Sequence, residues 1–277
     1  MGLVGAGPWA ETAHAPMLAA GPHTRLAGVW ARRPEAAARL GAPVFERLEE
    51  LFDACEAVAF CVPPGVQAEL AVQAAKAGKA LLLEKPLADS LEGARRLAET
   101  VAETGVPSQM LLTLRYTDAA RDFLARAAEI EPFGGHAVAV SDALLGGRYS
   151  SPWRLERGAL LDVGPHIVDL LDAALGRVVG VRAHGDPLRW TGLLLEHEGG
   201  AVSEASLCQA SAAYRREVAV FGRGGTAVFG EIGGRPLAAV AEEFARTVRQ
   251  GGGHPLDAAH GLRLQEIIAE AERQLLT

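Results

Sequence analysis

Three residues at two places in the sequence have the chemical types needed for proton transfer and charge stabilisation. Lys85 stands in Glu84-Lys85-Pro86, directly after the apolar run 80–83. Asp162 and His166 are four residues apart, so on one continuous helix they would share a face and the carboxylate could orient the imidazole. That arrangement is typical of a general base near neutral pH, but the same spacing is common in surface pairs. The spacing alone therefore identifies no reaction.

A glycine-rich turn near the start of the chain could bind phosphate. Residues 5–10 have the pattern G-x-G-x-x-A, preceded by a short apolar strand and followed by a helix. Gly5 would permit the tight turn, Gly7 would let the backbone approach a pyrophosphate, and Ala10 would allow close helix packing. This context favours a dinucleotide site over a glycine turn without a ligand.

The end of the second predicted strand bears on the type of dinucleotide. NAD-binding proteins usually place an Asp or Glu about twenty residues after the turn. Here residues 30–34 read Trp-Ala-Arg-Arg-Pro, without a carboxylate. The guanidinium groups of Arg32 and Arg33 suit a 2′-phosphate, so the segment favours NADP, with NAD still possible. The alternative is a pair of solvated loop arginines.

The first 116 residues alternate between strand and helix patterns. Apolar runs of strand length occur at 3–4, 25–30, 57–62, 80–83 and 109–116, separated by helical patterns at 34–40, at 66–77 and from Asp89, where Glu92 completes a capping-box pattern. Such alternation predicts an α/β domain with a doubly wound, mostly parallel sheet, a Rossmann architecture, over residues 1–116. The first strand is short, and we expect the true start of the protein a few codons upstream.

Residues 117–277 are predicted to form a second, α+β domain. Helix patterns at 118–129 and 160–175 accompany strand patterns at 135–145, 177–184, 188–198, 201–211, 215–221 and 226–229. Strands that follow one another across short glycine turns indicate antiparallel hairpins. Two helices, at 237–250 and 257–276, close the chain, and the last one could pack back on the first domain.

Composition narrows the classes of partner and compartment. The 277 residues suffice for two domains with hydrophobic cores, and the net charge of −7 disfavours binding to nucleic acid or to a membrane surface. Three cysteines without a C-x-x-C pair, and no recognisable targeting segment, indicate a cytoplasmic location. The histidines show no metal-ligand spacing, so no metal site is expected.

Taken in order, the motifs resemble the successive signatures of the Gfo/Idh/MocA family, the glucose-fructose oxidoreductase and inositol dehydrogenase group. The resemblance rests on the glycine turn, Val62-Pro63-Pro64, Glu84-Lys85-Pro86, Gly158 with Asp162 and His166, and the closing residues 254–259. It covers nearly the whole chain, and Glu84-Lys85-Pro86 together with the Asp162 and His166 pair is specific, whereas the glycine turn alone would not be. It implies a Rossmann domain followed by an α+β domain with an open, mainly antiparallel sheet, whose exposed face commonly forms homodimers or homotetramers.

The resemblance also implies a reaction and roles for its residues. It implies an NAD(P)-dependent oxidoreductase that transfers hydride between nicotinamide and a secondary alcohol or ketone of a sugar, cyclitol or related polyol. His166 would take the hydroxyl proton, Asp162 would orient the imidazole, and Lys85 would polarise the substrate oxygen. The Lys85-Pro86 bond becomes a candidate for the cis form.

Further positions follow from the motifs and the resemblance together. The expected cofactor-binding residues are Gly5, Gly7, Pro8, Trp9, Ala10, Ala31, Arg32, Arg33, Cys61, Pro63, Pro64, Gln67, Glu84 and Lys85. The expected substrate-cleft residues are Arg115, Tyr116, Trp153 and Arg154, although Trp153 could equally pack between domains. Gln67 replaces a histidine that is usual in the family, so one contact on the nicotinamide side is expected to differ.

Two other functions stay open at this point. Some relatives are glycosidases that use tightly bound nicotinamide for transient oxidation, and others are noncatalytic nucleotide-binding sensors. The presence of Lys85, Asp162 and His166 together argues against a sensor, which has no need of all three.

Overall fold

The computed structural model describes residues 1–147, 151–230 and 236–276, and the chain divides into two compact units. The first unit comprises Met1–Leu112 and Pro236–Gln265, and the second comprises Thr113–Arg235 and Glu266–Thr277. The sequence placed the division after Tyr116 and both closing helices in the second domain. In the structure the chain changes unit four residues earlier, and the segment from Pro236 to Gln265 returns to the first unit.

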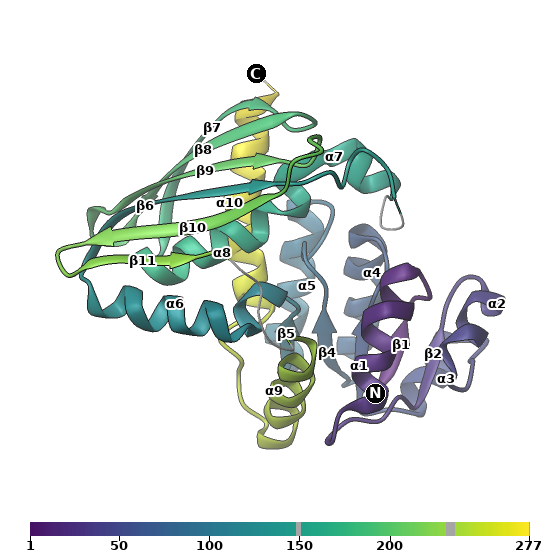
Figure 1. The fold of residues 1–277 in the computed structure, drawn as a ribbon. Coiled ribbons are helices and arrows are strands. Elements are labelled where there is room, and N and C mark those ends of the chain that lie inside the picture. The colour runs from purple at the N-terminus through teal and green to yellow at the C-terminus, as the bar shows by residue number, and fades with distance from the viewer. Residues whose placement is uncertain (148–150, 231–235, 277) are drawn as a thin grey trace. The chain divides into compact units, whose positions relative to one another are not determined.

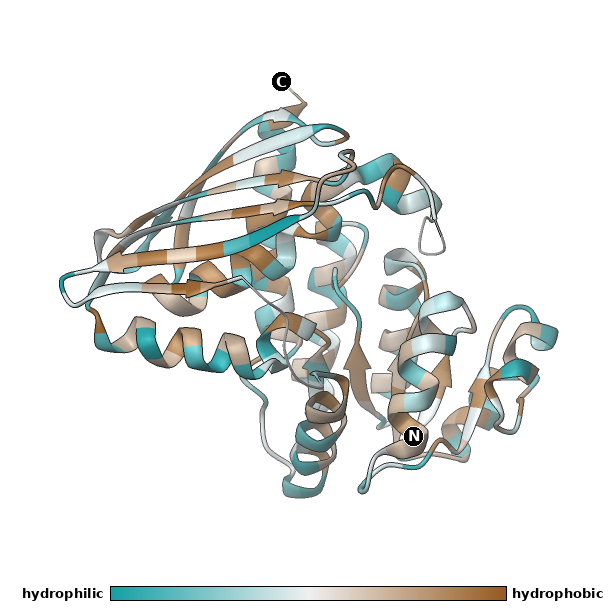
Figure 2. Ribbon diagram, viewed as in Figure 1, coloured by the Kyte–Doolittle hydropathy of each residue, from teal (hydrophilic) through white to brown (hydrophobic). Residues whose placement is uncertain are grey.

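The first unit is built on a five-stranded parallel sheet with the strand order β2-β1-β3-β4-β5 (Figure 1). Its strands are β1 (Gly2–Val4), β2 (Gly28–Trp30), β3 (Ala57–Phe60), β4 (Ala80–Leu83) and β5 (Ser108–Met110). The side chains of β3 and β4 are buried throughout, and β4 is hydrophobic along its length in Figure 2. Such continuous apolar strands are typical of a parallel sheet that is covered on both faces, so the predicted Rossmann architecture is confirmed.

The helices of this unit follow the predicted alternation, with two corrections. They are the π-helical turn Ala10–His14 leading into α1 (Ala15–Ala20), α2 (Pro34–Ala37) with the 3-10 turn Ala38–Leu40, α3 (Leu48–Asp53), α4 (Pro64–Lys76), α5 (Leu91–Thr104) and α9 (Pro236–Gln250). Helix α5 is capped by Ser90, whose hydroxyl accepts from the Gly93 amide, so the capping box expected at Asp89 was wrong. Helix α3 was not predicted, because six residues are too few for a clear period.

The second unit contains a six-stranded sheet with the order β11-β10-β6-β9-β8-β7. Its strands are β6 (Pro132–Val140), β7 (Val178–Asp186), β8 (Trp190–His197), β9 (Val202–Cys208), β10 (Arg215–Gly222) and β11 (Gly225–Phe229). All neighbouring pairs are antiparallel except β6 and β9, which are parallel. The predicted mainly antiparallel sheet is confirmed, while the single parallel pair joins strands that are distant in the sequence.

Helices α6 (Asp118–Glu129) and α8 (Gly164–Leu175) pack against this sheet within the second unit (Figure 1). The single helix expected at 160–175 is instead two, because α7 (Pro152–Asp162) ends at Val163 before α8 begins. Helix α7 itself is kinked at Gly158, which has a φ of 71°. A Cβ atom at Gly158 would lie 2.0 Å from the carbonyl oxygen of Pro187, so only glycine fits this kink.

Helix α10 (Ala258–Leu275) closes the chain, and its residues are divided between the two units. Within the described ranges, no helix combines the length and the apolar character that crossing a membrane requires.

Candidate active site

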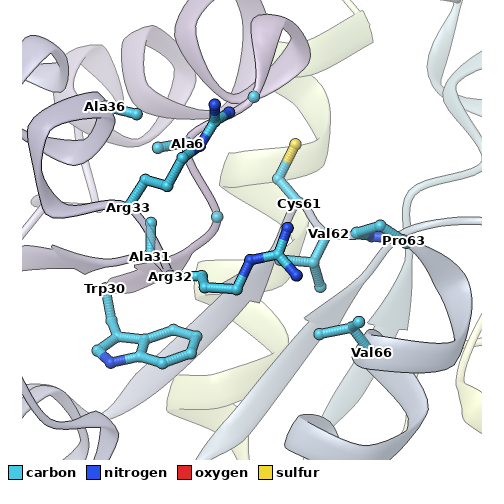
Figure 3. Close-up of a pocket in the computed structure, with 12 residues that line it drawn as sticks. Ala6, Trp30, Ala31, Arg32, Arg33, Ala36, Cys61, Val62, Pro63 and Val66 are labelled. Carbon is cyan, nitrogen blue, oxygen red and sulfur yellow. The ribbon is translucent and has the colours of Figure 1, made fainter. Parts of the chain in front are cut away.

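A cavity of about 320 Å³ opens in the first unit, where β1, β2 and β3 end (Figure 3). It is lined by the glycine turn, the end of β2 and the Cys61 to Val66 segment, in full Gly5, Ala6, Gly7, Trp30, Ala31, Arg32, Arg33, Ala36, Cys61, Val62, Pro63 and Val66. Ligands of open α/β sheets bind in this position, beyond the carboxyl ends of the strands. Seven of the residues predicted to bind cofactor line the cavity: Gly5, Gly7, Ala31, Arg32, Arg33, Cys61 and Pro63.

The glycine turn has the geometry that a dinucleotide requires. Gly5 has a φ of 114°, and a Cβ atom there would lie 2.1 Å from the carbonyl oxygen of Cys61. At Gly7 a Cβ atom would meet nothing within 4 Å, so the backbone is open to a ligand on that side. Ala10 is completely buried at the start of the following helical turn, as predicted for close packing. The turn therefore fits a pyrophosphate.

The two arginines after β2 extend into different parts of the cavity. In Figure 3 the Arg33 side chain points toward Ala6, whereas Arg32 extends toward Val62. Neither makes an ion pair within the described part of the chain, and both are exposed. A neighbouring hollow of about 250 Å³ shares Arg33 with the cavity, and its lining combines Pro8, Arg33 and Arg39 with two carboxylates, Glu11 and Glu35.

Glu84 is held through its side chain by two residues of the first helical segment. Trp9 Nε1 donates a hydrogen bond of 2.7 Å to Glu84 Oε1, and His14 Nε2 lies 2.8 Å from the same oxygen. Complete burial on its own would lower the pKa of His14, but Cys61 and Glu84 outweigh burial and raise it to about 10. His14 is therefore an imidazolium at neutral pH, paired with the Glu84 carboxylate.

The backbone on both sides of Lys85 is held by Gln67, a completely buried residue of α4. Gln67 Nε2 donates to the carbonyl oxygens of Glu84 at 2.8 Å and Leu87 at 3.0 Å, and Gln67 Oε1 accepts from the Glu84 amide at 2.8 Å. The Lys85-Pro86 bond is cis, as the resemblance suggested. The predicted contact of Gln67 with the cofactor stays a prediction, whereas its role in shaping this turn is direct.

In the second unit Asp162 receives two hydrogen bonds from other side chains. Arg154 Nε donates to Asp162 Oδ1 at 3.0 Å, and Gln209 Nε2 donates to Asp162 Oδ2 at 2.8 Å. Asp162 is the last residue of α7, and His166 lies in the first turn of α8, so the two do not share one continuous helix. The orienting role of Asp162 toward His166 stays a prediction, and the structure adds Arg154 and Gln209 as the groups that fix its carboxylate.

The other residues expected near substrate also lie in the second unit. Arg154 stacks over the Trp153 ring, with 4.5 Å between the guanidinium carbon and the ring centroid. Arg115 Nη1 donates to Asp169 Oδ1 at 2.8 Å, and Tyr116 is buried. Asp169 and Gln209 were missed, because neither belongs to a motif and each meets its partner from a distant part of the chain.

Two family models match most of the chain. Residues 1–111 match the model described as "Oxidoreductase family, NAD-binding Rossmann fold", and residues 135–228 match the "GFO/IDH/MocA C-terminal domain". Among curated proteins, glucose-6-phosphate 3-dehydrogenase from Bacillus subtilis (strain 168) is 34% identical over 120 residues. That match covers 42% of this chain and 34% of the relative, so it spans about a third of the relative's length.

Solved structures resemble nearly the whole chain. GenD2 from gentamicin A biosynthesis, solved in complex with NAD, has a TM-score of 0.86 at 21% identity, with 99% of this chain and 93% of that chain covered. UDP-N-acetylglucosamine 3-dehydrogenase from Acidithiobacillus ferrooxidans has a TM-score of 0.84 at 21% identity, with 99% and 96% covered. At these identities the likeness establishes a shared fold.

Proposed function

The chain belongs to the GFO/IDH/MocA oxidoreductase family, and on that premise we propose that it is an NADP-preferring dehydrogenase. Its substrate in this proposal is a secondary alcohol, or the matching ketone, of a sugar, cyclitol or related polyol. The names of the relatives support a sugar-like substrate, since two of them are dehydrogenases that act at position 3 of a sugar derivative.

The observation that carries the cofactor preference is the pair of exposed arginines at the end of β2. Arg32 and Arg33 line the cavity of the glycine turn without an ion pair in the described part of the chain. No carboxylate stands between Trp30 and Pro34 to accept from the ribose hydroxyls, as NAD-specific sites usually require. A 2′-phosphate would give the guanidinium groups the charged acceptor that they lack.

In the proposed reaction Lys85 and His166 act on the substrate oxygen and its proton, and Asp162 acts through His166. Bound nicotinamide would supply the hydride acceptor. His166 takes the proton of the substrate hydroxyl, while the Lys85 ammonium stabilises negative charge on that oxygen. The carboxylate of Asp162, held by Arg154 and Gln209, stabilises the charged imidazole. In the reducing direction the same groups return the proton.

Binding and turnover test the proposal separately. We expect fluorescence titrations to show tighter binding of NADPH than of NADH, and tighter or equal binding of NADH would reject the preference. A screen of sugars, inositols and sugar acids at saturating cofactor should show a change in nicotinamide absorbance. A complete blank with clear NADPH binding would reject the dehydrogenase, and release of an aglycone without net reduction would indicate a glycosidase instead.

The Lys85→Ala variant tests the assignment of the catalytic lysine. Loss of one positioned catalytic group typically costs about 10²–10⁴-fold in rate, so turnover should fall by that order. NADPH affinity should change little, because the cavity and its arginines are untouched. Unchanged turnover would remove Lys85 from the mechanism.

We also propose that the open face of the second unit's sheet joins copies of the chain into a dimer or tetramer. The register places Leu194, Glu204, His136, Ala219 and Val228 in one row across five strands. Leu194, on β8, is 38% exposed and Val228, on the edge strand β11, is 58% exposed, so the row presents aliphatic side chains to solvent near both of its ends. Light scattering should give a mass of two or four chains, and Leu194→Lys with Val228→Lys should give monomers.

A further inference from the structure

Helix α4 carries a glutamine that is shielded from water beside the segment that contains Lys85. Gln67 is completely buried, whereas the preceding residue, Val66, is 40% exposed. Glutamine is mostly an exposed residue in proteins, and burial of a side-chain amide is costly unless its donors and its acceptor are paired. The burial of Gln67 therefore indicates that its amide has specific partners.

The hydrogen-bond partners of the Gln67 amide are backbone groups. Gln67 Nε2 donates to the carbonyl oxygens of Glu84 at 2.8 Å and Leu87 at 3.0 Å, with a longer contact of 3.3 Å to that of Pro86. Gln67 Oε1 accepts from the Glu84 amide at 2.8 Å. The side chain thus pairs with both backbone groups of Glu84, as the backbone of a neighbouring strand would, directly after β4 ends at Leu83.

Lys85 lies inside the segment that these hydrogen bonds fix. Gln67 bonds to Glu84 directly before Lys85 and to Leu87 two residues after it. Buried apolar side chains flank the same segment, since Leu83 is 0% and Leu87 is 1% exposed. The backbone position of Lys85 therefore depends on one buried side chain of α4 as well as on the sheet and the core.

The start of α4 also forms part of the nucleotide cavity. Pro63, the residue before the helix, and Val66, in its first turn, line that cavity (Figure 3). Gln67 follows Val66 directly, so adjacent residues of one helical turn contact the cavity and hold the Lys85 segment. Because a single turn of helix is a rigid element, it fixes the distance between Lys85 and a dinucleotide bound in the cavity.

We propose that Gln67 is a positioning residue, which holds Lys85 at the place from which its ammonium reaches the substrate oxygen. The inference rests on the proposed function for the role of Lys85, and it adds the residue that determines where Lys85 lies. It differs from the expectation of a cofactor contact, because both donors of this buried amide are used by backbone carbonyls. Misplacement of a catalytic group by about 1 Å can cost about 10²-fold in rate, so loss of the amide should reduce turnover.

The first experiment measures the Lys85 segment in the absence of cofactor and substrate. The Gln67→Met variant has an apolar side chain of similar length, so the Glu84 amide loses its acceptor. Hydrogen exchange, followed by mass spectrometry of peptides that span residues 84–88, should be at least about threefold faster than in wild-type protein. Gln73→Met, the same substitution at an exposed position of α4, is the matched control and should leave this exchange unchanged. Unchanged exchange in Gln67→Met would show that the amide does not hold the segment, and would overturn the proposal.

The second experiment compares turnover with cofactor affinity. The substrate is the sugar, inositol or sugar acid that wild-type protein turns over fastest in the screen described above. At saturating cofactor and substrate, kcat of Gln67→Met should fall by about 10-fold to 100-fold, while the Kd of NADPH should change by less than about twofold. Gln73→Met should leave both quantities unchanged. Weaker NADPH binding at unchanged kcat would assign Gln67 to a cofactor contact and reject the positioning role.

A second variant keeps the test decisive if Gln67→Met does not fold, which circular dichroism establishes. Gln67→His then takes its place, because a neutral imidazole has one donor and one acceptor and cannot donate to the Glu84 and Leu87 carbonyls together. Exchange should again be faster and kcat lower than in wild-type protein, by smaller factors than those given for Gln67→Met. Wild-type values of both quantities in folded Gln67→His would contradict the proposal.

The third experiment determines whether Gln67 acts through Lys85. A general structural effect of Gln67→Met would slow the Lys85→Ala variant by the same factor as wild-type protein. If Gln67 acts by positioning Lys85, kcat of the double variant should stay within about twofold of that of Lys85→Ala alone, because a lysine that is absent cannot be displaced. Multiplying losses would overturn the proposal.

The proposed function and the positioning role fail in different ways. If wild-type protein binds NADPH but turns over no compound of the screen, the proposed function is contradicted, and with it the effect of Gln67 on turnover. If wild-type protein turns over a substrate and Gln67→Met matches Gln73→Met in both exchange and kcat, the dehydrogenase stands and the positioning role is overturned.

Discussion

The arginines around the cavity of the first unit and three arginines of the second unit, in the 3-10 turn Thr113–Tyr116 and in α7, differ in whether they are paired with carboxylates. Arg32, Arg33 and Arg39 are exposed and make no ion pair within the described residues. In the second unit three arginines hold carboxylates: Arg115 with Asp169 at 2.8 Å, Arg154 with Asp162 at 3.0 Å and Arg157 with Glu272 at 2.9 Å. The first set is therefore accessible to a ligand, whereas the second set neutralises carboxylates within the fold.

This difference distinguishes charged side chains that stabilise the fold from charged side chains that are available to bind a ligand. A paired arginine beside a buried carboxylate is fixed in one geometry, and removing it leaves an uncompensated charge. An unpaired, exposed arginine contributes little to folding and is available to an anion such as phosphate. Substitutions in the two sets should accordingly change different observables, stability in the second unit and ligand affinity in the first.

The largest effect is expected for Arg115→Ala. Asp169 is completely buried, so loss of its guanidinium partner leaves a carboxylate in a medium of low polarity. Breaking such a pair typically costs about 3–5 kcal/mol, and urea denaturation should show a loss of that order. Arg189→Ala, which removes an arginine that is 86% exposed, is the matched control and should leave stability unchanged.

Replacing both partners sharpens the same test. Arg115→Met together with Asp169→Leu removes the charges as a pair, and such apolar replacements are often close to neutral. If the double variant is as unstable as Arg115→Ala, the loss comes from packing rather than from an unpaired charge.

His14 is the exception in the first unit, because it is a buried charged group in an ion pair. Burial alone would lower the pKa of His14, but Cys61 and Glu84 outweigh burial and raise it from 6.5 to about 10. The pKa of His14 is therefore higher in the folded than in the unfolded chain. Its contribution to stability is therefore fully present below pH 6.5, declines as the pH rises, and is lost through pH 10. Between pH 7 and 9.5 we expect wild-type protein to lose about 3 kcal/mol of unfolding free energy. The His14→Gln variant should show a flatter profile, and parallel profiles would contradict the assignment.

The sequence was most informative where function depends on local pattern. The glycine turn, the apolar strands and the Glu84-Lys85-Pro86 turn lie within short segments, so spacing alone located the cavity and most of its lining. The contacts that hold Glu84 join residues 70 and 75 positions apart, and no local pattern encodes them. His14 gave no signal by itself, because a lone histidine in an apolar segment is usually a core residue.

In the second unit even more of the structure depends on contacts between distant segments, which local sequence patterns do not predict. Asp162 and His166 were expected on one helix, but α7 ends at Val163 and α8 begins at Gly164 with Pro165 in its first turn. The kink within α7 depends on a distant segment, because Gly158 packs against the carbonyl oxygen of Pro187. The parallel pairing of β6 with β9 brings together segments that α7, α8, β7 and β8 separate along the chain, so hairpin signals could not reveal it. Gln209, which donates a hydrogen bond to the Asp162 carboxylate, comes directly after β9, so its position depends on that pairing as well.

Substitution of an arginine at the end of β2 should moderately reduce the affinity for NADPH but not the affinity for NADH. Arg33→Ala should weaken NADPH binding by about tenfold to thirtyfold, because it removes a charge-assisted hydrogen bond to a phosphate. NADH affinity and the urea midpoint should stay unchanged, since Arg33 has no ion pair in the described part of the chain. The NADPH affinity of the Arg39→Ala variant shows whether the neighbouring hollow, which Arg39 lines, contributes to NADPH binding. Equal losses for NADPH and NADH would place Arg33 at the shared part of the dinucleotide.

The smallest effect is expected where pairing occurs without burial. Arg273 Nη2 lies 2.6 Å from Glu270 Oε1 on α10, a shorter distance than that in the Arg115 pair, and the hydrogen bond from Arg273 lowers the pKa of Glu270 to about 2. Both side chains are largely surrounded by water, which screens the charges and competes for their hydrogen bonds. Arg273→Ala should therefore leave the melting temperature within experimental error. A loss comparable to that of Arg115→Ala would show that short distance, rather than burial of the carboxylate, decides which arginines stabilise the second unit.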